Sequence, residues 1–397
     1  MTDKQIFNVR IGLIRAFLWE RKCDGILLNR CDNFAMATGG RRNYIYTYGD
    51  LGANGLFVSK EGRVFFVGNN IEVTRQMAEE LGSLGCDVLE FPWFQDTPAG
   101  AVRKRFPGTL VSDDGSLGAN VNDALTPLRA LLTEGELEKY RRLGALAADA
   151  MTSTLDAIRA GMTEHEIAAT LISEGAKRRC HIPVTLVAAD KRIAQFRHPL
   201  PTQERLLNRG LQERAVLGYV MVVGCFLREG LVVSITRFKQ VGPIAADVPS
   251  AMERIAAVDA TMQEATCPGR TMGDVFTACQ KAYAEFGFRP DEWHNHHQGG
   301  STGYAGRTCK AVPNYPFPIL DRSWAHRAKE FLGEEVELGM AFAWNPSAPG
   351  VKSEDTFVLL PDGRREIVTL TPALPTIDLE RVLGRPTEVV KAGMVAG

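Results

Sequence analysis

The residues best suited to chemistry are histidines that cluster in one short segment. Three of the seven histidines fall within His294-Asn295-His296-His297, directly before Gln298 and two glycines. An imidazole titrates near neutral pH, so it can accept and return a proton, and its neutral form binds metal ions. A turn that simply precedes the glycines is the ordinary alternative. Such a turn does not require three side chains that titrate near neutral pH, so the segment predicts a functional site.

A further histidine stands between an arginine and a proline, in Arg197-His198-Pro199. Proline disfavours helical geometry in the residue before it, so His198 is expected in an extended or turn segment. Exposure in a solvent-facing loop would be the ordinary explanation of this residue. Its side chain nevertheless suits general acid and base catalysis, because imidazole can take up and release a proton at neutral pH.

The composition limits the classes of partner. The 397 residues carry 46 basic and 47 acidic side chains, which leaves a formal net charge of -1. Binding to nucleic acid or to an anionic membrane depends on a surplus of lysine and arginine, and the chain has none. The basic and aromatic segment Arg41-Arg42-Asn43-Tyr44 is therefore not interpreted as a nucleic-acid site. We expect small-molecule or protein partners, with no nucleic acid and no membrane.

The expected location follows from apolar runs and cysteines. No apolar run reaches the length of a signal peptide or of a membrane-spanning helix. The eight cysteines are scattered and form no C-x-x-C pair, which favours reduced, mostly buried thiols over a disulfide framework or a zinc site. These features predict a cytoplasmic protein.

The histidines need a scaffold, and the length of the chain predicts two domains. Residues 1–130 show alternating helical and strand patterns, which indicate an α/β domain. Its expected elements are a helix at 6–22, a strand at 25–28, a hairpin of 55–58 and 63–67, a helix at 70–84 and a strand at 86–91.

Residues 131–397 form the second expected domain, in which helices accompany β-strands. Capping boxes at Thr133-x-x-Glu136 and Thr163-x-x-Glu166 open two helices. Two more helices are expected at 249–266 and 272–286. Runs rich in valine, isoleucine and aromatic residues predict strands at 183–188, 216–225, 231–240, 339–344, 355–360 and 364–370.

Four segments of this second domain occur in a recognisable order. They are Phe196-Arg-His198-Pro, Ser234-Ile-Thr-Arg237, His297 followed shortly by two glycines, and Gly350-Val-Lys-Ser-Glu354-Asp355. Their order and spacing resemble the catalytic domain of the creatinase, aminopeptidase P and prolidase family, over roughly residues 135–372. The resemblance implies a pita-bread fold, in which helices cover a curved antiparallel sheet, behind an N-terminal α/β domain. It also implies a homodimer.

The metallopeptidases of that family hold two divalent ions with two aspartates, one histidine and two glutamates. Carried over by position, these ligands correspond to Val223, Ser234, His297, Asn345 and Glu354. One carboxylate stands where four are expected, and a valine offers no ligand atom. We therefore expect neither a dinuclear metal centre nor another cofactor. A single ion on His296, His297 and Glu354 is the open alternative.

Creatinase is a metal-free member of the family, and the resemblance implies that a histidine serves there as proton shuttle. That histidine corresponds to His198, so His198 is the predicted general acid and base. We expect His297 and Glu354 to complete the catalytic set, with Glu354 orienting His297 or binding a substrate cation. A surface charge at a strand end is the ordinary alternative for Glu354.

A further set of residues is predicted to bind the substrate. Arg237 would bind a carboxylate through its planar guanidinium, unless it forms a structural ion pair. Tyr304 would donate a hydrogen bond, unless it packs in the wall of the site. In creatinase-like dimers a loop of the N-terminal domain reaches the partner's pocket, so the resemblance implies that Arg42 contributes to substrate binding. The full set is His296, Arg237, Tyr304, Asn345, Ser234, Trp344 and Arg42.

The leading hypothesis is a metal-independent, creatinase-like hydrolase that cleaves a C–N bond of amide or amidine type in a small nitrogen-containing metabolite. The same pocket could run an elimination or an isomerisation. A non-catalytic binding module derived from a peptidase is the alternative outside the enzymes. A metal-dependent Xaa-Pro peptidase is disfavoured by the missing ligands.

Overall fold

The computed structural model describes residues 1–201, 215–306, 309–310 and 335–396. The chain divides into two compact units, Met1–Lys139 with Glu229–Leu231, and Tyr140–Arg228 with Val232–Gly397. The division falls inside helix α6 (Glu134–Ala157), a few residues after the expected boundary between 130 and 131. The first turns of α6 belong with the N-terminal unit because Glu136 forms a fully buried ion pair with Arg10.

The N-terminal unit contains a mixed five-stranded sheet in the order β4-β3-β2-β1-β5. Its strands are β1 (Gly25–Arg30), β2 (Leu51–Ser59), β3 (Val64–Asn69), β4 (Asp87–Phe91) and β5 (Leu110–Ser112). Strands β2 and β3 form the expected hairpin, in which Val58 is paired with Val64. The main helices are α1 (Asp3–Glu20), α2 (Cys31–Thr38), α4 (Pro98–Arg105) and α5 (Thr126–Ala130).

The helix expected at 70–84 differs from the structure. Only Val73–Gln76 is α-helical (α3), and it is followed by a π-helical turn at Met77–Leu81 and a 3₁₀ turn at Gly82–Leu84. The segment ends at Gly85, whose φ of 69° lies in the left-handed region that glycine adopts without strain. The helical periodicity therefore located the segment and its end, while the turn type changes along it.

The C-terminal unit is built on two sheets. The first has the order β16-β8-β7-β6, and the second has the order β10-β9-β11-β14-β15. The strands of the first are β6 (His181–Ala189), β7 (Tyr219–Arg228), β8 (Leu231–Gln240) and β16 (Val395–Ala396). Those of the second are β9 (Gly299–Thr302), β10 (Cys309–Lys310), β11 (Ala341–Trp344), β14 (Asp355–Leu359) and β15 (Arg365–Ile367). A short hairpin of β12 (Ser347–Ala348) and β13 (Val351–Lys352) joins β11 to β14.

The two sheets meet where β8 lies beside β14. The Ser234 amide donates to the Thr356 hydroxyl at 2.8 Å, and that hydroxyl donates to the Ser234 carbonyl at 2.9 Å. Two residues further along, the Thr236 amide donates to the Glu354 carbonyl at 3.2 Å. Strand β8 is buried along almost its whole length, although Ser234, Thr236 and Arg237 interrupt its apolar residues, and these buried polar side chains need partners inside the protein. Ser234 in β8 and Glu354, directly before β14, are thereby held on neighbouring segments.

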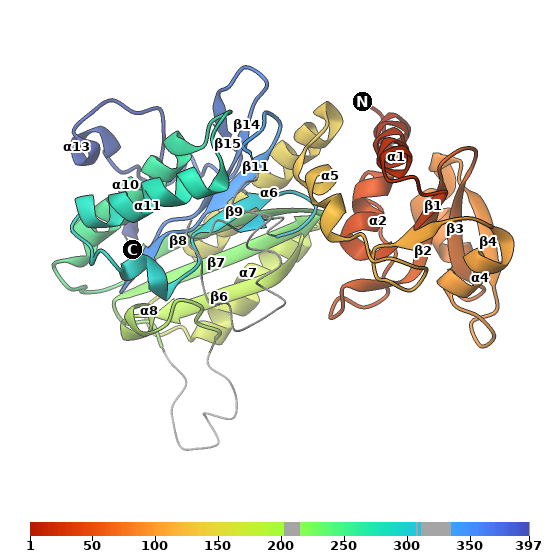
Figure 1. The fold of residues 1–397 in the computed structure, drawn as a ribbon. Helices are drawn as coiled ribbons and strands as arrows, with labels where there is room; N and C mark the ends of the chain where they lie inside the picture. The colour runs from red at the N-terminus through yellow and green to blue at the C-terminus, as the bar shows by residue number, and fades with distance from the viewer. Residues whose placement is uncertain (202–214, 307–308, 311–334, 397) are drawn as a thin grey trace. The chain divides into compact units, whose positions relative to one another are not determined.

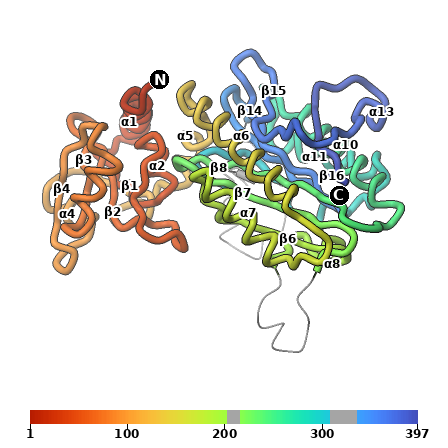
Figure 2. The backbone as a smooth tube through the Cα atoms, turned by 180° about the vertical axis from the view of Figure 1, so that it is seen from behind, coloured from red at the N-terminus to blue at the C-terminus, as the bar shows by residue number. Residues whose placement is uncertain are grey.

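Helices flank both sheets. Figure 2 shows α6 and α7 (Glu164–Lys177) beside the β6–β8 strands, and the Tyr140 hydroxyl of α6 donates to the Val232 carbonyl of β8 at 2.7 Å. Figure 1 shows α10 (Val248–Ala265) and α11 (Met272–Glu285) as a pair, and α10 also contacts β11 and β13. Short helices occur at α8 (Lys191–Gln195) and α13 (Leu379–Leu383). None of the described helices is long and apolar enough to cross a bilayer.

The core of the C-terminal unit contains a cluster of charges as well as apolar side chains. Arg237 donates to Asp355 at 2.6 Å, and Lys391 lies 2.5 Å from Asp259 and 3.4 Å from Asp355. All four side chains are at least 97% buried. Because buried charges are tolerated only when they are paired, these contacts tie the C-terminal segment to α10 and β14.

Candidate functional site

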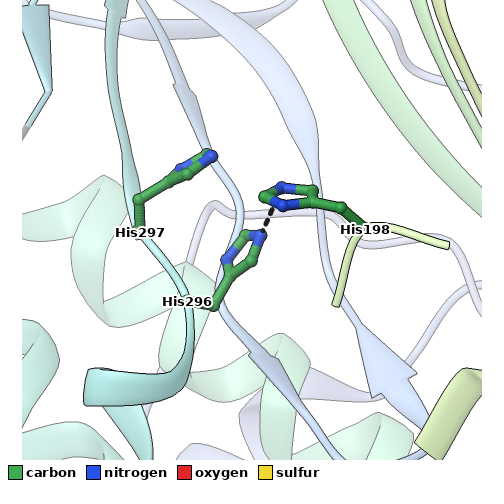
Figure 3. A group of neighbouring side chains, drawn as sticks. All are labelled: His198, His296 and His297. Atoms are coloured by element: carbon green, nitrogen blue, oxygen red, sulfur yellow. Dashed lines mark hydrogen bonds between the residues drawn. The ribbon is translucent and has the colours of Figure 1, made fainter. Parts of the chain in front are cut away.

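Three histidines predicted as site residues converge in the C-terminal unit. His296 and His297 lie between a 3₁₀ turn (Glu292–Asn295) and β9, whereas His198 lies in the loop after α8. The Nε2 atoms of His296 and His198 are 3.0 Å apart, so one ring donates a hydrogen bond to the other (Figure 3). The ring centroid of His297 lies 4.5 Å from that of His296 and 5.2 Å from that of His198. Residues about a hundred positions apart in the sequence thus form one imidazole cluster.

The segment that carries His296 and His297 is fixed by the two residues that follow. The Gln298 side-chain amide donates to the Trp293 carbonyl at 3.1 Å and accepts from the Tyr283 hydroxyl at 3.0 Å, which anchors the segment to α11. Gly299 has a φ of 96°, and a Cβ atom there would lie 2.2 Å from the Ala343 carbonyl oxygen of β11. Only glycine satisfies both constraints. The glycine after the histidines is therefore needed for the close approach of β9 to β11.

The three histidines differ in their surroundings. His198 is exposed, His297 is partly buried and His296 is 7% exposed. Burial, followed by the positive charges of Lys352, the other two histidines and Arg197, holds the pKa of His296 far below its ordinary value. His296 is therefore neutral at physiological pH. Its Nδ1 atom is buried and has no hydrogen-bond partner among the described residues.

The positions that correspond to the family's metal ligands lack the carboxylates that would bind two divalent ions. Val223 is buried in β7 and has no donor atom. Ser234 is fully buried, and its hydroxyl oxygen lies 3.3 Å from Cys225 Sγ. Asn345 is 2% exposed and donates its backbone amide to the Gln298 carbonyl at 3.1 Å. These residues do not fit a pair of divalent ions, which require several anionic oxygen ligands.

Glu354, the remaining carboxylate, is balanced by an ammonium group of the protein itself. Lys352 Nζ lies 3.3 Å from Glu354 Oε2, and both side chains are at most 3% exposed. The Thr236 hydroxyl donates to the same carboxylate oxygen at 2.7 Å. A buried carboxylate requires such compensation, whether from a cation of the protein or from a metal ion. Here Lys352 supplies the positive charge.

Two of the predicted substrate-binding residues are committed to the interior. Each guanidinium nitrogen of Arg237 donates within the protein, to Thr371, to Asp355 and to three backbone carbonyls. This is the structural ion pair that the sequence left open. Trp344 is fully buried and donates Nε1 to the Thr266 hydroxyl at the end of α10. Trp344 is the last residue of β11 and packs in the core, whereas Asn345 follows the strand.

Tyr304 and Arg42, also predicted to bind substrate, lie in different surroundings. Tyr304 follows β9 and is 2% exposed, and the carbonyl of the preceding Gly303 accepts from the Val232 amide at 2.9 Å. Arg42 belongs to the N-terminal unit, where its Nη2 lies 2.6 Å from Glu80 in the π-helical turn. Their proposed contacts with substrate stay predictions.

Lys352 and Thr236 contact Glu354 but were not among the predicted site residues. Strand periodicity could have indicated Thr236, which stands two residues from Ser234 in β8, whereas Lys352 ends β13 and Glu354 precedes β14. Residues two apart on a strand share a face. Alternation alone does not reveal that the Thr236 hydroxyl and the Lys352 ammonium meet at one carboxylate oxygen, since that contact joins separate strands.

The paired sheets with their covering helices define the C-terminal unit as a pita-bread fold, and the three histidines cluster within it. The model of metallopeptidase family M24 matches residues 138–361, which is more than half of the chain. The protein belongs to metallopeptidase family M24. This confirms the fold class and the family expected from the motif order. Members of the family are hydrolases.

Solved structures of the same fold span nearly the whole chain. Dipeptidase PepE from Mycobacterium ulcerans has a TM-score of 0.68 at 18% identity, with 100% of both chains covered. A dipeptidase from Pyrococcus horikoshii OT3 has a TM-score of 0.70 at 19% identity, covering 91% of this chain and 98% of that one. Prolidase from Pyrococcus furiosus has a TM-score of 0.66 at 16% identity, covering 90% and 99%. No curated protein sequence matches the chain.

Proposed function

We propose that the protein is a metal-independent hydrolase that cleaves a C–N bond of amide or amidine type in a small nitrogen-containing molecule. The observation that carries this proposal is the 3.0 Å contact between the exposed His198 and the buried His296. A proton-transfer group is thereby held by a second imidazole in a family of hydrolases. Structural relatives described as dipeptidases and a prolidase favour an amide bond as the one that is cleaved.

Metal independence is supported by the residues that replace the family ligands. A valine, a serine and an asparagine stand at three of the carboxylate positions, and the fourth carboxylate, Glu354, is neutralised by Lys352. Two divalent ions at this place would add four positive charges beside an ammonium group, with one carboxylate to offset them. Coulomb repulsion of that size is incompatible with tight binding of the family's ion pair.

The histidine pair performs the proton transfers. In this proposal the His198 Nε2–H group donates to His296 Nε2, and His198 Nδ1 acts as the base. Nδ1 takes a proton from water while the water oxygen bonds to the carbonyl or amidine carbon. The C–N bond then breaks as His198 returns that proton to the leaving nitrogen. The net change is the addition of one water molecule across the bond.

His198 is the member of the pair that carries the proton. It is exposed, so its imidazolium form remains hydrated, whereas His296 is buried near Lys352 and Arg197. A neutral His296 accepts a stronger hydrogen bond once His198 is charged. His297 and Glu354 complete the set, His297 through its contact with both rings and Glu354 through its ion pair with Lys352.

The substrate is a small molecule, and we propose contacts with Asn345, Ser234 and Tyr304 from the C-terminal unit. Arg42 would contribute from the N-terminal domain of the partner in a cytoplasmic homodimer. The family resemblance supports the dimer, and the balanced total of 46 basic and 47 acidic residues agrees with a small-molecule partner.

The experiment uses untagged protein purified with a chelator and checked by elemental analysis. N-acyl amino acids, dipeptides and guanidino acids are screened for release of amine, and each hit is repeated with His198→Ala. We expect turnover without metal and a loss of about 100-fold or more in kcat for the variant. His294→Ala, in the same segment as His296 but exposed, is the matched control and should retain full activity. Turnover that requires two equivalents of Mn²⁺, or that survives His198→Ala, contradicts the proposal.

A further inference from the structure

We infer that His198, His296 and His297 form a binding site for a single transition-metal ion with three nitrogen ligands. Among the described residues, these histidines are the group whose side chains could hold an ion, and one ring nitrogen from each lies within 4.8 Å of the others (Figure 3). The site shares only His297 with the positions at which the family holds its two ions. It therefore differs from the family's dinuclear centre in its ligands, in its charge and in the number of ions that it holds.

The geometry requires little rearrangement. Nitrogen ligands about 2.0–2.1 Å from a tetrahedral zinc ion lie roughly 3.3 Å from one another. The His198 and His296 Nε2 atoms are 3.0 Å apart, and the third nitrogen lies within 4.8 Å of them. Rotations of the rings within their broad χ2 range bring the third nitrogen closer. His198 comes from an exposed loop residue, so it can adjust without disturbing the sheet.

The ligand chemistry selects the kind of ion. Three neutral imidazoles suit Zn²⁺, Co²⁺, Ni²⁺ and Cu²⁺, whereas Mg²⁺, Ca²⁺ and Mn²⁺ prefer carboxylate and other oxygen ligands. The nearest fixed cations are already compensated, since Lys352 pairs with Glu354 and Arg197 pairs with Glu292. A single ion on three neutral ligands therefore lies among charges that already compensate one another. Two ions would bring four positive charges, and Glu354 alone cannot offset them.

The inference has a consequence for activity that rests on the proposed function. An ion bound to His198 and His296 displaces the proton that the two rings share. His198 then no longer exchanges a proton with water or with the leaving nitrogen. A bound Zn²⁺ or Ni²⁺ ion therefore inhibits the hydrolase, and a chelator restores it.

The test titrates Co²⁺ into the untagged full chain and follows its visible absorption, with Zn²⁺ as competitor and Mn²⁺ as the oxygen-preferring comparison. We expect one equivalent of Co²⁺ to bind, Zn²⁺ to displace it, and Mn²⁺ not to compete. His198→Ala and His297→Ala should each weaken binding by about tenfold or more, because each removes one ligand. His294→Ala should bind as the native chain does, and far-UV circular dichroism checks that each variant is folded.

The outcomes separate this inference from the proposed function, because binding is measured without substrate. No uptake, two equivalents, or unchanged affinity in folded His198→Ala overturns the inference, whether or not the chain hydrolyses anything. Loss of binding in Glu354→Gln with no loss in His198→Ala also overturns it, since the ion would then occupy a carboxylate site. Tight binding at the histidines with undiminished turnover supports the site and contradicts the role of His198 as proton carrier.

Discussion

Replacing Lys352 by methionine tests whether an internal ammonium group compensates Glu354. The substitution keeps most of the apolar stem of the side chain and removes its charge. At 3.3 Å and an effective dielectric constant of about 20, the interaction between the two charges is about 5 kcal/mol. Removing one member of a buried pair usually costs about 3–5 kcal/mol, because the other charge stays buried without a partner.

We expect Lys352→Met to lower the free energy of unfolding by about 3–5 kcal/mol, a large part of the total stability of a typical protein. Urea unfolding followed by tryptophan fluorescence measures it, because Trp344 lies in the strand next to β14. The double variant Lys352→Met with Glu354→Gln removes both charges and keeps an acceptor for the Thr236 hydroxyl. It should recover most of the loss.

The matched control is Lys281→Met, at an exposed position of α11, which should change the stability by less than about 0.5 kcal/mol. The reasoning is refuted if Lys352→Met costs no more than this control. It is also refuted if the double variant is less stable than Lys352→Met alone, since the penalty would then not arise from an isolated carboxylate.

Three further predictions concern the neighbourhood of the site. Because burial lowers the pKa of His296 in the folded state, only the unfolded state takes up a proton there below about pH 6.5, and stability falls with decreasing pH. In urea unfolding with chelator present, lowering the pH from 7.5 to 5.5 should cost the native chain about 1 kcal/mol more than it costs His296→Asn. Equal losses in the two proteins would argue against a neutral His296. Arg237→Met should lower the free energy of unfolding, measured by calorimetry, by about 3–5 kcal/mol, since Asp355 loses a buried partner. A variant of near-native stability would instead favour a role of Arg237 in substrate binding. Gly299→Ala forces a Cβ atom to 2.2 Å from the Ala343 carbonyl, so we expect the free energy of unfolding to fall by more than about 2 kcal/mol and Co²⁺ to bind more weakly at the histidines. Gly363 also has a positive φ but has open space around it, so Gly363→Ala should lower the free energy of unfolding by less.

The sequence predicted the scaffold well because its signals are local. Strand β7 is apolar along most of its length, and the capping box of Thr163 with Glu166 is present at a helix start as expected. The order of the four segments then identified the family. These features depend on neighbouring residues or on spacing along the chain, which a sequence shows directly.

The directions of single side chains were harder to predict. Trp344 was predicted to bind substrate, yet its side chain is fully buried and donates to Thr266 at the end of α10. Arg237 belongs to the motif that identified the family, yet its partners Asp355 and Thr371 lie more than a hundred residues away. The contact between His198 and His296 likewise joins residues 98 positions apart. Such pairings are set by the three-dimensional fold, which spacing does not encode.

The pairing of Lys391 with Asp259 and Asp355 bears on the order in which the protein becomes structured during synthesis. Apart from Glu229–Leu231, the N-terminal unit has been made once residue 139 leaves the ribosome, and its buried Arg10 then has its partner Glu136, so that unit can fold early. In the C-terminal unit Asp355 also has Arg237 as a partner, but Asp259 lacks the ammonium group of Lys391 until residue 391 has been made, so we expect this unit to reach its full stability last. We therefore expect chaperones to be most needed in the interval before the C-terminal segment has been made.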